Sequence, residues 1–503
     1  MEREIIFGPP GTGKTQTLIE KVAKLLNDGM ETDQLGYVSF SKKANLESIA
    51  RAQKIGGFTI SEWDLPYFRT LHSLAFRQLG IDPKTQLMKS ADYNEFAEWI
   101  GIINFETEDS MDESGMIISK NQYLNQINLA RYKCIPLRQQ YDLNEHNGKV
   151  WWHTLEKIAR ALPEWKKKAH KYDFTDVIEI AVAKKAAPRL KVLFVDEAQD
   201  LNRLQWNYVH VLEEKSEKSF IAGDDDQAIY TFQGADVDHF LGLEGKKTIL
   251  TQSHRVPRKV YELAQMVVGR LSKRQVKTWT PRPEDGEVHW INSLRSIDFK
   301  EGKTLVLASA NYMLNKVKDY LESWGYAYQT RGHRGIKEGF IETLLEWEQW
   351  RSKARLPFES VKRIYGNLTV KDKQLRRGFK GCKTLMPDKS YTMEECKKDH
   401  GLLEDRPWAD ALHCDVRTVN YIEAMQRNGE DISKPPRITL STIHAAKGGE
   451  SGKVALMQDI SWNATKAYEA NPDPIHRQFY TGITRTQHTL YVLSPDTRNY
   501  YKI

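Results

Sequence analysis

The sequence predicts an α/β fold with two parallel-sheet cores, each interrupted by a mostly helical insertion. Short apolar runs recur along the 503 residues, and longer segments with helical spacing separate them. Unbroken apolar runs are typical of strands that are buried on both faces of a parallel sheet. Two polar stretches break the alternation. The apolar runs lie at 5–7, 37–40, 192–195, 220–222, 304–307, 454–457 and 490–493.

The two polar stretches set the predicted domain boundaries. Residues 76–171 are helical in pattern and polar, whereas 331–436 are charged and end at Pro435-Pro436 before a strand pattern resumes. Length alone predicts three or four domains at about 150 residues each. We therefore expect a first core (1–75 and 172–250), a helical insertion (76–171), a second core (251–330 and 437–503) and a basic insertion (331–436).

Composition excludes several classes of protein. Hydrophobic residues make up 40% and charged residues 28% of the chain, which is ordinary for a globular protein and excludes a disordered or collagen-like one. Four cysteines are too few for a disulfide scaffold. No apolar run approaches the roughly 18 residues of a membrane span, and the chain opens directly into a strand pattern. We expect a cytoplasmic protein with no membrane partner.

Residues 8–15 match the phosphate-loop pattern G-x-x-x-x-G-K-[ST] in the required context. An apolar run precedes the loop, and apolar residues at helical spacing follow it. Backbone N–H groups of such a loop wrap phosphates at a helix N-terminus. Lys14 is expected to reach the β- and γ-phosphates, and the Thr15 hydroxyl to ligate Mg²⁺. The predicted phosphate-binding residues are Gly8, Pro9, Pro10, Gly11, Thr12, Gly13, Lys14 and Thr15.

A second apolar run ends in Asp196-Glu197-Ala198-Gln199-Asp200. A carboxylate at the C-terminal end of a parallel strand lies at the edge where open α/β sheets bind ligands. We expect Asp196 to hold Mg²⁺ through water and Glu197 to polarise the attacking water. The alternative is an acidic helix N-terminus after the strand.

Together with the phosphate loop, residues 223–235 make the chain resemble a UvrD/Rep-type superfamily 1 helicase. This stretch reads Gly-Asp-Asp-Asp-Gln-Ala-Ile-Tyr-Thr-Phe-Gln-Gly-Ala. The resemblance implies two RecA-like cores, with Gln227 as the γ-phosphate sensor and Tyr230 and Phe232 facing the bases of single-stranded DNA. An aromatic ring is a stacking platform for any base. The alternative is that Tyr230 and Phe232 are core residues.

Further stretches resemble other motifs of the family, in the family's order. The resemblance implies DNA contacts at Phe40 within 39–45, at His72 within 70–73, and at Thr442 and His444 within 442–450. Arg255 and Arg485, both expected on the second core, match two arginines that stabilise charge on the γ-phosphate. An arginine finger of this kind supplies about 10³–10⁵ in rate. The resemblance also places Gln16, His254 and Glu450 at the nucleotide.

Three positions depart from the family pattern. His254 stands where a tyrosine usually stacks on the base, Gly449 stands where the family has leucine, and no aromatic residue follows Glu450. Imidazole offers less stacking area than a phenol ring, so His254 is expected to stack on the nucleotide base over a smaller area. Because Gly449 replaces leucine and no aromatic residue follows Glu450, one contact of the fifth motif to nucleic acid is expected to be lost.

The basic excess is confined to one block. Residues 351–400 hold 14 Lys and Arg against 6 Asp and Glu, whereas the whole chain has a net charge of +7. Such a block either binds an anionic partner or is a solvated helical face. Cys382, Cys396, His400, His413 and Cys414 lie in the same insertion, as buried thiols or, less in keeping with their spacing, as a zinc site.

The motifs and the family resemblance together predict an ATP- and Mg²⁺-dependent enzyme that translocates on single-stranded DNA and unwinds duplex. The resemblance of the third-motif stretch to the 3′-to-5′ branch of the superfamily implies that it steps 3′ to 5′. Closure of the two cores would couple hydrolysis to stepping. Its expected partners are single-stranded DNA and single-strand/duplex junctions, and it is expected to act as a monomer. The alternative is a nucleotide-switched clamp that holds nucleic acid or protein without unwinding.

Overall fold

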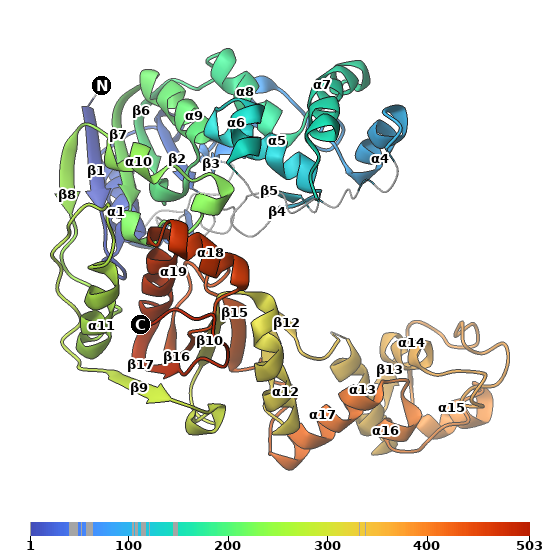
Figure 1. The fold of residues 1–503 in the computed structure, drawn as a ribbon. Helices are drawn as coiled ribbons and strands as arrows, with labels where there is room; N and C mark the ends of the chain where they lie inside the picture. The colour runs from blue at the N-terminus through green and yellow to red at the C-terminus, as the bar shows by residue number, and fades with distance from the viewer. Residues whose placement is uncertain are drawn as a thin grey trace. The chain divides into compact units, whose positions relative to one another are not determined.

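The computed structural model describes residues 2–39, 49–51, 53–56, 64–102, 105, 109–111, 117–119, 121–143, 149–330, 332–337 and 339–503. By its contacts the chain divides into two compact units, which we treat separately. Unit 1 comprises 1–286, 466–485 and 503, and unit 2 comprises 287–465 and 486–502. Both are α/β, and each holds one large sheet (Figure 1), so the predicted fold class is confirmed.

Unit 1 is built on a six-stranded sheet in which every pairing is parallel. The strand order is β3-β2-β6-β7-β1-β8, so the strand before the phosphate loop lies between β7 and β8. Apolar side chains on both faces are buried, which accounts for the unbroken apolar runs in the sequence. The strands are β1 (Glu2–Phe7), β2 (Leu35–Ser39), β3 (Phe68–Thr70), β6 (Leu190–Val195), β7 (Ser216–Gly223) and β8 (Lys246–Ile249).

Helices cover this sheet and form its insertion. Leu18, Ile19 and Val22 lie on one face of α1 and are fully buried, as their spacing predicts. The insertion has its own apolar core around Phe96, Leu155 and Ile158, and α4 to α7 lie together in Figure 1. The helices of unit 1 are α1 (Lys14–Asn27), α3 (Leu71–Leu79), α4 (Ser90–Trp99), α5 (Gln122–Lys133), α6 (Leu137–Asp142), α7 (Trp152–Ala169), α8 (Phe174–Ala183), α9 (Arg203–Glu214), α10 (Val237–Leu241), α11 (Arg258–Val268) and α19 (Asp473–Ile483). A short hairpin pairs β4 (Asp109–Met111) with β5 (Ile117–Ser119).

Unit 2 is built on a seven-stranded sheet in the order β12-β11-β15-β10-β16-β17-β9. All pairings are parallel except that of β11 with β12, which is antiparallel. The strands are β9 (Glu287–Ile291), β10 (Thr304–Ala308), β11 (Tyr328–Thr330), β12 (His333–Arg334), β15 (Ile438–Thr442), β16 (Ser451–Met457) and β17 (Thr486–Leu493).

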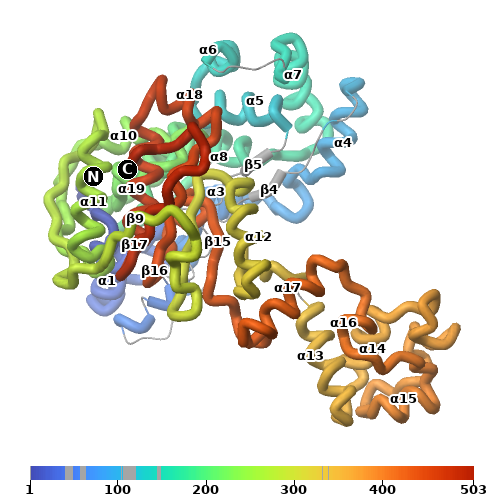
Figure 2. Tube along the Cα trace, turned by 60° about the horizontal axis from the view of Figure 1, so that its bottom comes forward, coloured from blue at the N-terminus to red at the C-terminus, as the bar shows by residue number. Residues whose placement is uncertain are grey.

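The insertion of unit 2 packs onto the core of its sheet through one continuous apolar cluster. Trp347 and Trp350 are fully buried in this cluster, and their indole N–H groups donate to backbone carbonyls of Arg406 and Tyr391. Helices α12 and α17 lie side by side, and α13 to α16 gather beyond them (Figure 2). The helices are α12 (Asn315–Ser323), α13 (Phe340–Arg351), α14 (Phe358–Asn367), α15 (Met393–Asp399), α16 (Trp408–Ala411) and α17 (Val416–Arg427), with β13 (Leu356–Pro357) paired to β14 (Ser390–Tyr391). Helix α18 (Trp462–Ala470) spans the division between the units.

Two segments group differently from the sequence-based boundaries. The pattern predicts that 251–286 and 466–485 belong to the second core, yet both lie in unit 1 by contact. Helix α11 packs against α19, and Arg477 donates from Nε to the carbonyl of Asp225 at 2.9 Å. These contacts join residues more than 200 positions apart, so the local pattern held no signal for them.

Candidate nucleotide site and nucleic-acid contacts

The phosphate loop connects β1 to α1 and depends on left-handed glycines. Gly11 and Gly13 have φ values of 72° and 81°, a region that glycine enters without steric cost. Gly8 N–H donates to the carbonyl of Gly223 on β7 at 3.1 Å. Lys14 folds back over the loop, and its Nζ donates to the Gly8 carbonyl at 2.9 Å. The loop is thus anchored to the sheet with its lysine held across it.

A segment from later in unit 1 packs on this loop. Ser253 Oγ donates to the Pro10 carbonyl at 2.7 Å, and His254 N–H donates to the Gly11 carbonyl at 2.8 Å. A Cβ on Gly11 would lie 2.4 Å from Cβ of Arg255, so only glycine allows this approach. His254 is exposed and Arg255 is half-buried. The fourth-motif residues therefore lie beside the phosphate loop in unit 1.

The end of β6 brings the predicted Mg²⁺ ligands together. Thr15 Oγ1 donates to Oδ2 of Asp196 at 2.7 Å, and the Tyr37 hydroxyl donates to the same oxygen at 2.9 Å. Burial, and then the charge of Glu197, raise the pKa of Asp196, although the bonds from Thr15 and Tyr37 oppose the shift. A buried carboxylate beside a threonine hydroxyl provides the oxygen donors that Mg²⁺ prefers.

Glu197 follows Asp196 in an unusual backbone conformation. Its φ is 53°, in the left-handed region that costs a non-glycine residue about 1–2 kcal/mol. Its carboxylate accepts from Gln199 Nε2 at 2.5 Å. Gln199 is fully buried, and its Oε1 accepts from Asp224 N–H at 2.9 Å. Gln199 thus joins the candidate base to the third motif, a role the sequence did not assign although the residue lies within the Asp-Glu stretch.

Gln227 is held at both ends of its amide. Its Nε2 donates to Oδ2 of Asp224 at 2.6 Å, and its Oε1 accepts from Nη2 of Arg485. Burial opposes ionisation of Asp224, but Lys277 and Lys14 outweigh it and lower the pKa of this carboxyl. The predicted sensor and one predicted arginine finger are therefore in direct contact.

The location of the two arginines differs from the prediction. Arg255 and Arg485 were expected on the second core, but both lie in unit 1 together with Lys14 and Asp196. Arg485 is buried, and its Nε donates to the Thr481 carbonyl at 3.0 Å. It is followed directly by Thr486, the first residue of β17 in unit 2. Two further residues were predicted to contact the nucleotide. Gln16 donates to Glu20 within α1, and Glu450 lies in unit 2, where it accepts a bond from Gln487.

The two third-motif rings differ sharply in exposure. Phe232 is 59% exposed, whereas Tyr230 is 7% exposed and packs with Ile229 and Ala235. Their ring centroids lie 6.4 Å apart. Phe232 thus presents a ring to solvent in this state, while Tyr230 is packed as the core alternative describes.

The other predicted nucleic-acid contacts are distributed over both units. His72 lies in the first turn of α3 with its ring edge-on to Phe174, and burial lowers its pKa to about 4, so it is neutral at pH 7. Phe40 lies outside the described residues. In unit 2, Thr442 ends β15 and His444 follows it, half-buried. Thr442 lines a cavity of about 260 Å³ together with Asn311, Lys318, Thr330 and Ser441.

The basic block is neither helical nor paired at its centre. Residues 371–389, here called the basic segment, form successive turns between α14 and α15. The solvated-helix alternative is therefore wrong for this segment. Its cations are all exposed, and none forms an ion pair with a residue of the described ranges. They are Lys371, Lys373, Arg376, Arg377, Lys380, Lys383 and Lys389.

Hydrogen bonds to the rest of the insertion and buried apolar side chains fix the turns of the basic segment. Gln374 Nε2 donates to the Ala411 carbonyl at 2.6 Å, and Arg376 N–H donates to the Gly401 carbonyl at 2.8 Å. Leu375, Cys382 and Leu385 are buried. Within the described part of the chain, no group of three or more His, Cys, Asp or Glu is arranged to hold a metal. Burial raises the pKa of Cys396 to about 12, which keeps this thiol protonated.

Comparison with known proteins agrees with the motifs. Residues 2–248 match the family model of the UvrD/REP helicase N-terminal domain. The chain is 24% identical over 404 residues to ATP-dependent DNA helicase PcrA of Staphylococcus aureus, an alignment that covers 73% of this chain and 50% of the relative. The PcrA protein of Staphylococcus epidermidis is also 24% identical, over 403 residues with the same coverage. The resemblance to UvrD/Rep-type helicases is thereby confirmed.

Two further findings bear on these matches. The chain spans about half the length of the PcrA relatives. In the described ranges, no helix is both long enough and apolar enough to span a membrane.

Proposed function

We propose that this protein is an ATP-dependent motor that translocates on single-stranded DNA and unwinds duplex at single-strand/duplex junctions. The observation that carries the proposal is the series of hydrogen bonds in unit 1 that connects the phosphate loop to the acidic strand end and then, through Gln199, to the sensor and an arginine. The PcrA relatives bear the name of ATP-dependent DNA helicases. A nucleotide-binding protein without turnover has no need of all these groups.

The chain's own residues provide the groups for hydrolysis. Lys14 neutralises charge on the transferred phosphate, and Glu197 accepts a proton from the attacking water. Gln199 orients the Glu197 carboxylate through its 2.5 Å bond. Gln227 and Arg485, which are bonded to each other, would act on the phosphate as a pair, and Arg255 adds a second cation beside the loop. Charge that develops late in the reaction is stabilised by donors fixed in advance.

Thr15 and Asp196 are the residues that would hold Mg²⁺. Both present oxygen atoms, and those atoms lie 2.7 Å apart. The ion supplies charge neutralisation for the phosphates when it is bound. Gln16, His254 and Glu450 would contact the nucleotide.

Single-stranded DNA is proposed to contact Phe232, His72, Thr442 and His444, with Phe40 as a further contact. The exposed ring of Phe232 suits stacking with any base. Coupling to stepping is proposed to pass through Arg485, because this residue is bonded to the predicted sensor and directly precedes β17 of the second sheet. Movement of Arg485 during hydrolysis would therefore be transmitted along the chain to unit 2. We expect a monomer that steps 3′ to 5′.

One pair of assays tests the proposal. Phosphate release is measured with and without oligonucleotide, and strand displacement is measured on duplexes with a 3′ or a 5′ single-stranded tail. DNA-stimulated release with unwinding of the 3′-tailed duplex is expected. Unwinding of the 5′-tailed duplex alone would overturn the polarity and leave the hydrolysis site intact. Nucleotide-dependent DNA binding without turnover or unwinding would instead support a switched clamp.

A further inference from the structure

Lys277 lies in a segment that matched no motif, yet it is fully buried against the third motif. Its Nζ lies 2.8 Å from Oδ1 of Asp224 and 2.9 Å from Oδ2 of Asp226, and it also contacts Asp225. The side chains of all four residues have no exposed surface. A buried charge requires such partners, because desolvation is otherwise strongly unfavourable.

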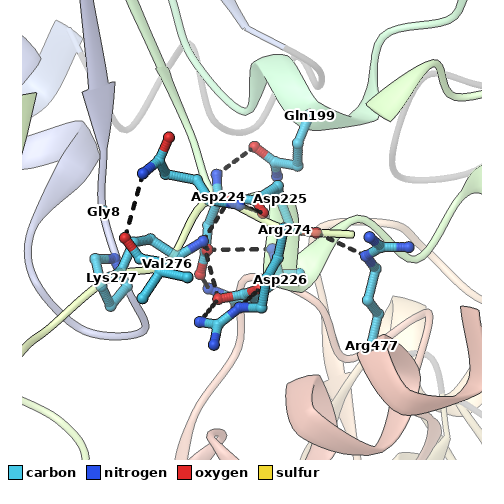
Figure 3. A network of polar contacts seen from close by, with 12 residues as sticks. Gly8, Gln199, Asp224, Asp225, Asp226, Arg274, Val276, Lys277 and Arg477 are labelled. Atoms are coloured by element: carbon cyan, nitrogen blue, oxygen red, sulfur yellow. Dashed lines mark hydrogen bonds and ion pairs between the residues drawn. The ribbon is translucent and has the colours of Figure 1, made fainter. Parts of the chain in front are cut away.

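Asp224 connects this lysine to the predicted sensor. One of its carboxylate oxygens, Oδ1, faces Lys277, while the other, Oδ2, accepts from Gln227 Nε2 at 2.6 Å. Its backbone N–H donates to Gln199, which holds Glu197. Figure 3 shows Gln199 beside the backbone of Asp224, whereas Lys277 and Arg274 contact aspartate carboxylates of the same turn. The orientation of the Asp224 carboxylate thus bears directly on the sensor, whereas the bond to Gln199 comes from the Asp224 backbone and does not depend on that side chain.

The segment carrying Lys277 also fixes the helix that precedes Arg485. Arg274 forms a two-pronged pair with Asp226, with contacts of 2.8 and 2.6 Å. Arg477 of α19 donates to the carbonyl of Asp225 at 2.9 Å (Figure 3) and to that of Lys273 at 2.8 Å. These two bonds, together with the bonds that Ser272 and Lys273 donate to Asp473 at the start of α19, tie α19 to the aspartate turn and to the segment 272–277.

We infer that Lys277 is a positioning residue for hydrolysis, which fixes Asp224 so that Gln227 meets Arg485 at the phosphate. Lys277 touches neither nucleotide nor DNA in this role and acts through the Gln227 amide. The inference rests on the proposed hydrolysis of nucleotide. A buried ion pair with a purely structural role would affect stability and leave the reaction of the folded protein unchanged.

The test is Lys277→Met, alone and combined with Gln227→Ala, in the full chain. Methionine keeps the length of the side chain and removes the charge. We expect kcat to fall on the order of tenfold or more, because small displacements of catalytic groups are costly. The Kd for a non-hydrolysable ATP analogue is expected to change by no more than about threefold, because the phosphate loop is intact. The double variant should hydrolyse no more slowly than Gln227→Ala alone, within about twofold.

Lys166→Met is the matched control. Lys166 is a buried lysine of the same unit, 6% exposed, that pairs with Asp173 and Asp176 at 2.6 Å and has no link to Gln227. It should lower the melting temperature while kcat stays at the wild-type value. If Lys277→Met does not fold, Asp224→Asn tests the same connection and should also be non-additive with Gln227→Ala.

The outcomes separate the inference from the function on which it rests. Wild-type kcat in folded Lys277→Met or Asp224→Asn would overturn the inference, as would losses that multiply with Gln227→Ala. Absence of DNA-stimulated phosphate release from the wild-type protein would instead reject the proposed function. A fall in kcat equal to that of Lys166→Met would assign Lys277 a structural role only.

Discussion

The aspartate turn at 224–226 and the basic segment at 371–389 concentrate charge in opposite ways. In the turn, three carboxylates and Lys277 are fully buried, and each has defined partners. In the basic segment, seven cations are exposed, and none pairs within the described residues. Each buried charge is held by specific hydrogen bonds and ion pairs, so removing one leaves its partners without a counter-charge. Exposed charges act together through the electrostatic potential of the surface, so the loss of any one of them has a small effect.

This comparison predicts large, non-additive effects around the turn and small, additive effects in the basic segment. The same contrast applies to the rings of the third motif, one buried and one exposed.

The largest effect is expected for Glu197→Gln. The amide cannot accept a proton from water, so kcat should fall at least about 10³-fold while nucleotide binding is retained. Single-turnover hydrolysis and a fluorescent-nucleotide titration measure the two quantities. Glu156→Gln, which alters an exposed pair with Arg160, is the control. Near-normal turnover in Glu197→Gln would remove this residue from the role of base.

Arg485→Ala should come next. The arginine is buried against Gln227 and should stabilise charge in the transition state, so kcat should fall by about 10³ with little change in KM. Arg255→Ala should act in the same direction. Steady-state ATPase assays separate the two constants, with Arg138→Ala, which breaks an exposed pair with Asp142, as control. A change in KM alone would make both arginines binding residues.

Substitution of the two third-motif rings should affect DNA binding differently. Phe232→Ala should weaken single-strand affinity by about 1–3 kcal/mol, because an exposed ring is available for stacking. Tyr230→Ala should mainly lower the melting temperature, because that ring is packed with Ile229. Fluorescence anisotropy and thermal melts measure the two effects. Equal losses of DNA affinity in both variants would show that Tyr230 becomes exposed when DNA binds.

The buried turn should also make stability depend on pH. Burial, reinforced by Asp224 and Asp225 against the opposing charge of Lys277, raises the pKa of Asp226 from 3.8 to about 6. A raised carboxyl pKa favours the neutral form in the fold, so the contribution of Asp226 to stability falls as pH rises through 4 to 6.

From pH 5 to pH 7, the free energy of unfolding of wild type relative to Asp226→Asn should therefore fall by about 1 kcal/mol. Urea unfolding at the two pH values measures it. Asp238→Asn, at an exposed pair with Lys273, should show no such difference. A difference that grows with pH would reverse the predicted sign.

The sequence predicted what is encoded locally. The apolar runs became strands, and Leu18, Ile19 and Val22 face the core because their spacing is helical. The phosphate loop is contiguous, so its residues identify it. Lys277 and Gln199 were not assigned, because their role arises from contacts with Asp224, which lies 53 and 25 residues away in the chain.

Other features depend on tertiary packing that no local pattern reports. Tyr230 and Phe232 stand two apart around the short 3₁₀ turn Thr231–Gln233, and spacing there does not say which ring is buried. The grouping of Arg255 and Arg485 with unit 1 follows from the packing of α11 on α19. The basic segment has the composition of a solvated helix, but buried Leu375 and Leu385 and the bond from Gln374 hold it in turns.

The smallest single effects are expected in the basic segment. Each neutralisation, such as Arg376→Gln, Arg377→Gln or Lys380→Gln, should weaken binding to a tailed duplex only several-fold in 0.1 M salt. For every DNA phosphate that is no longer neutralised, the slope of log K against log salt should become shallower by roughly 0.7–0.9. The triple variant should show the sum of the three single changes, because exposed charges do not share partners. Arg355→Gln is the matched control, since Arg355 is an exposed cation of the same insertion that is paired with Glu395 at 2.9 Å. Basal ATPase without DNA should stay unchanged in all of these variants. An unchanged salt slope in the triple variant, or an equal change in Arg355→Gln, would show that these cations serve solubility and do not contact DNA.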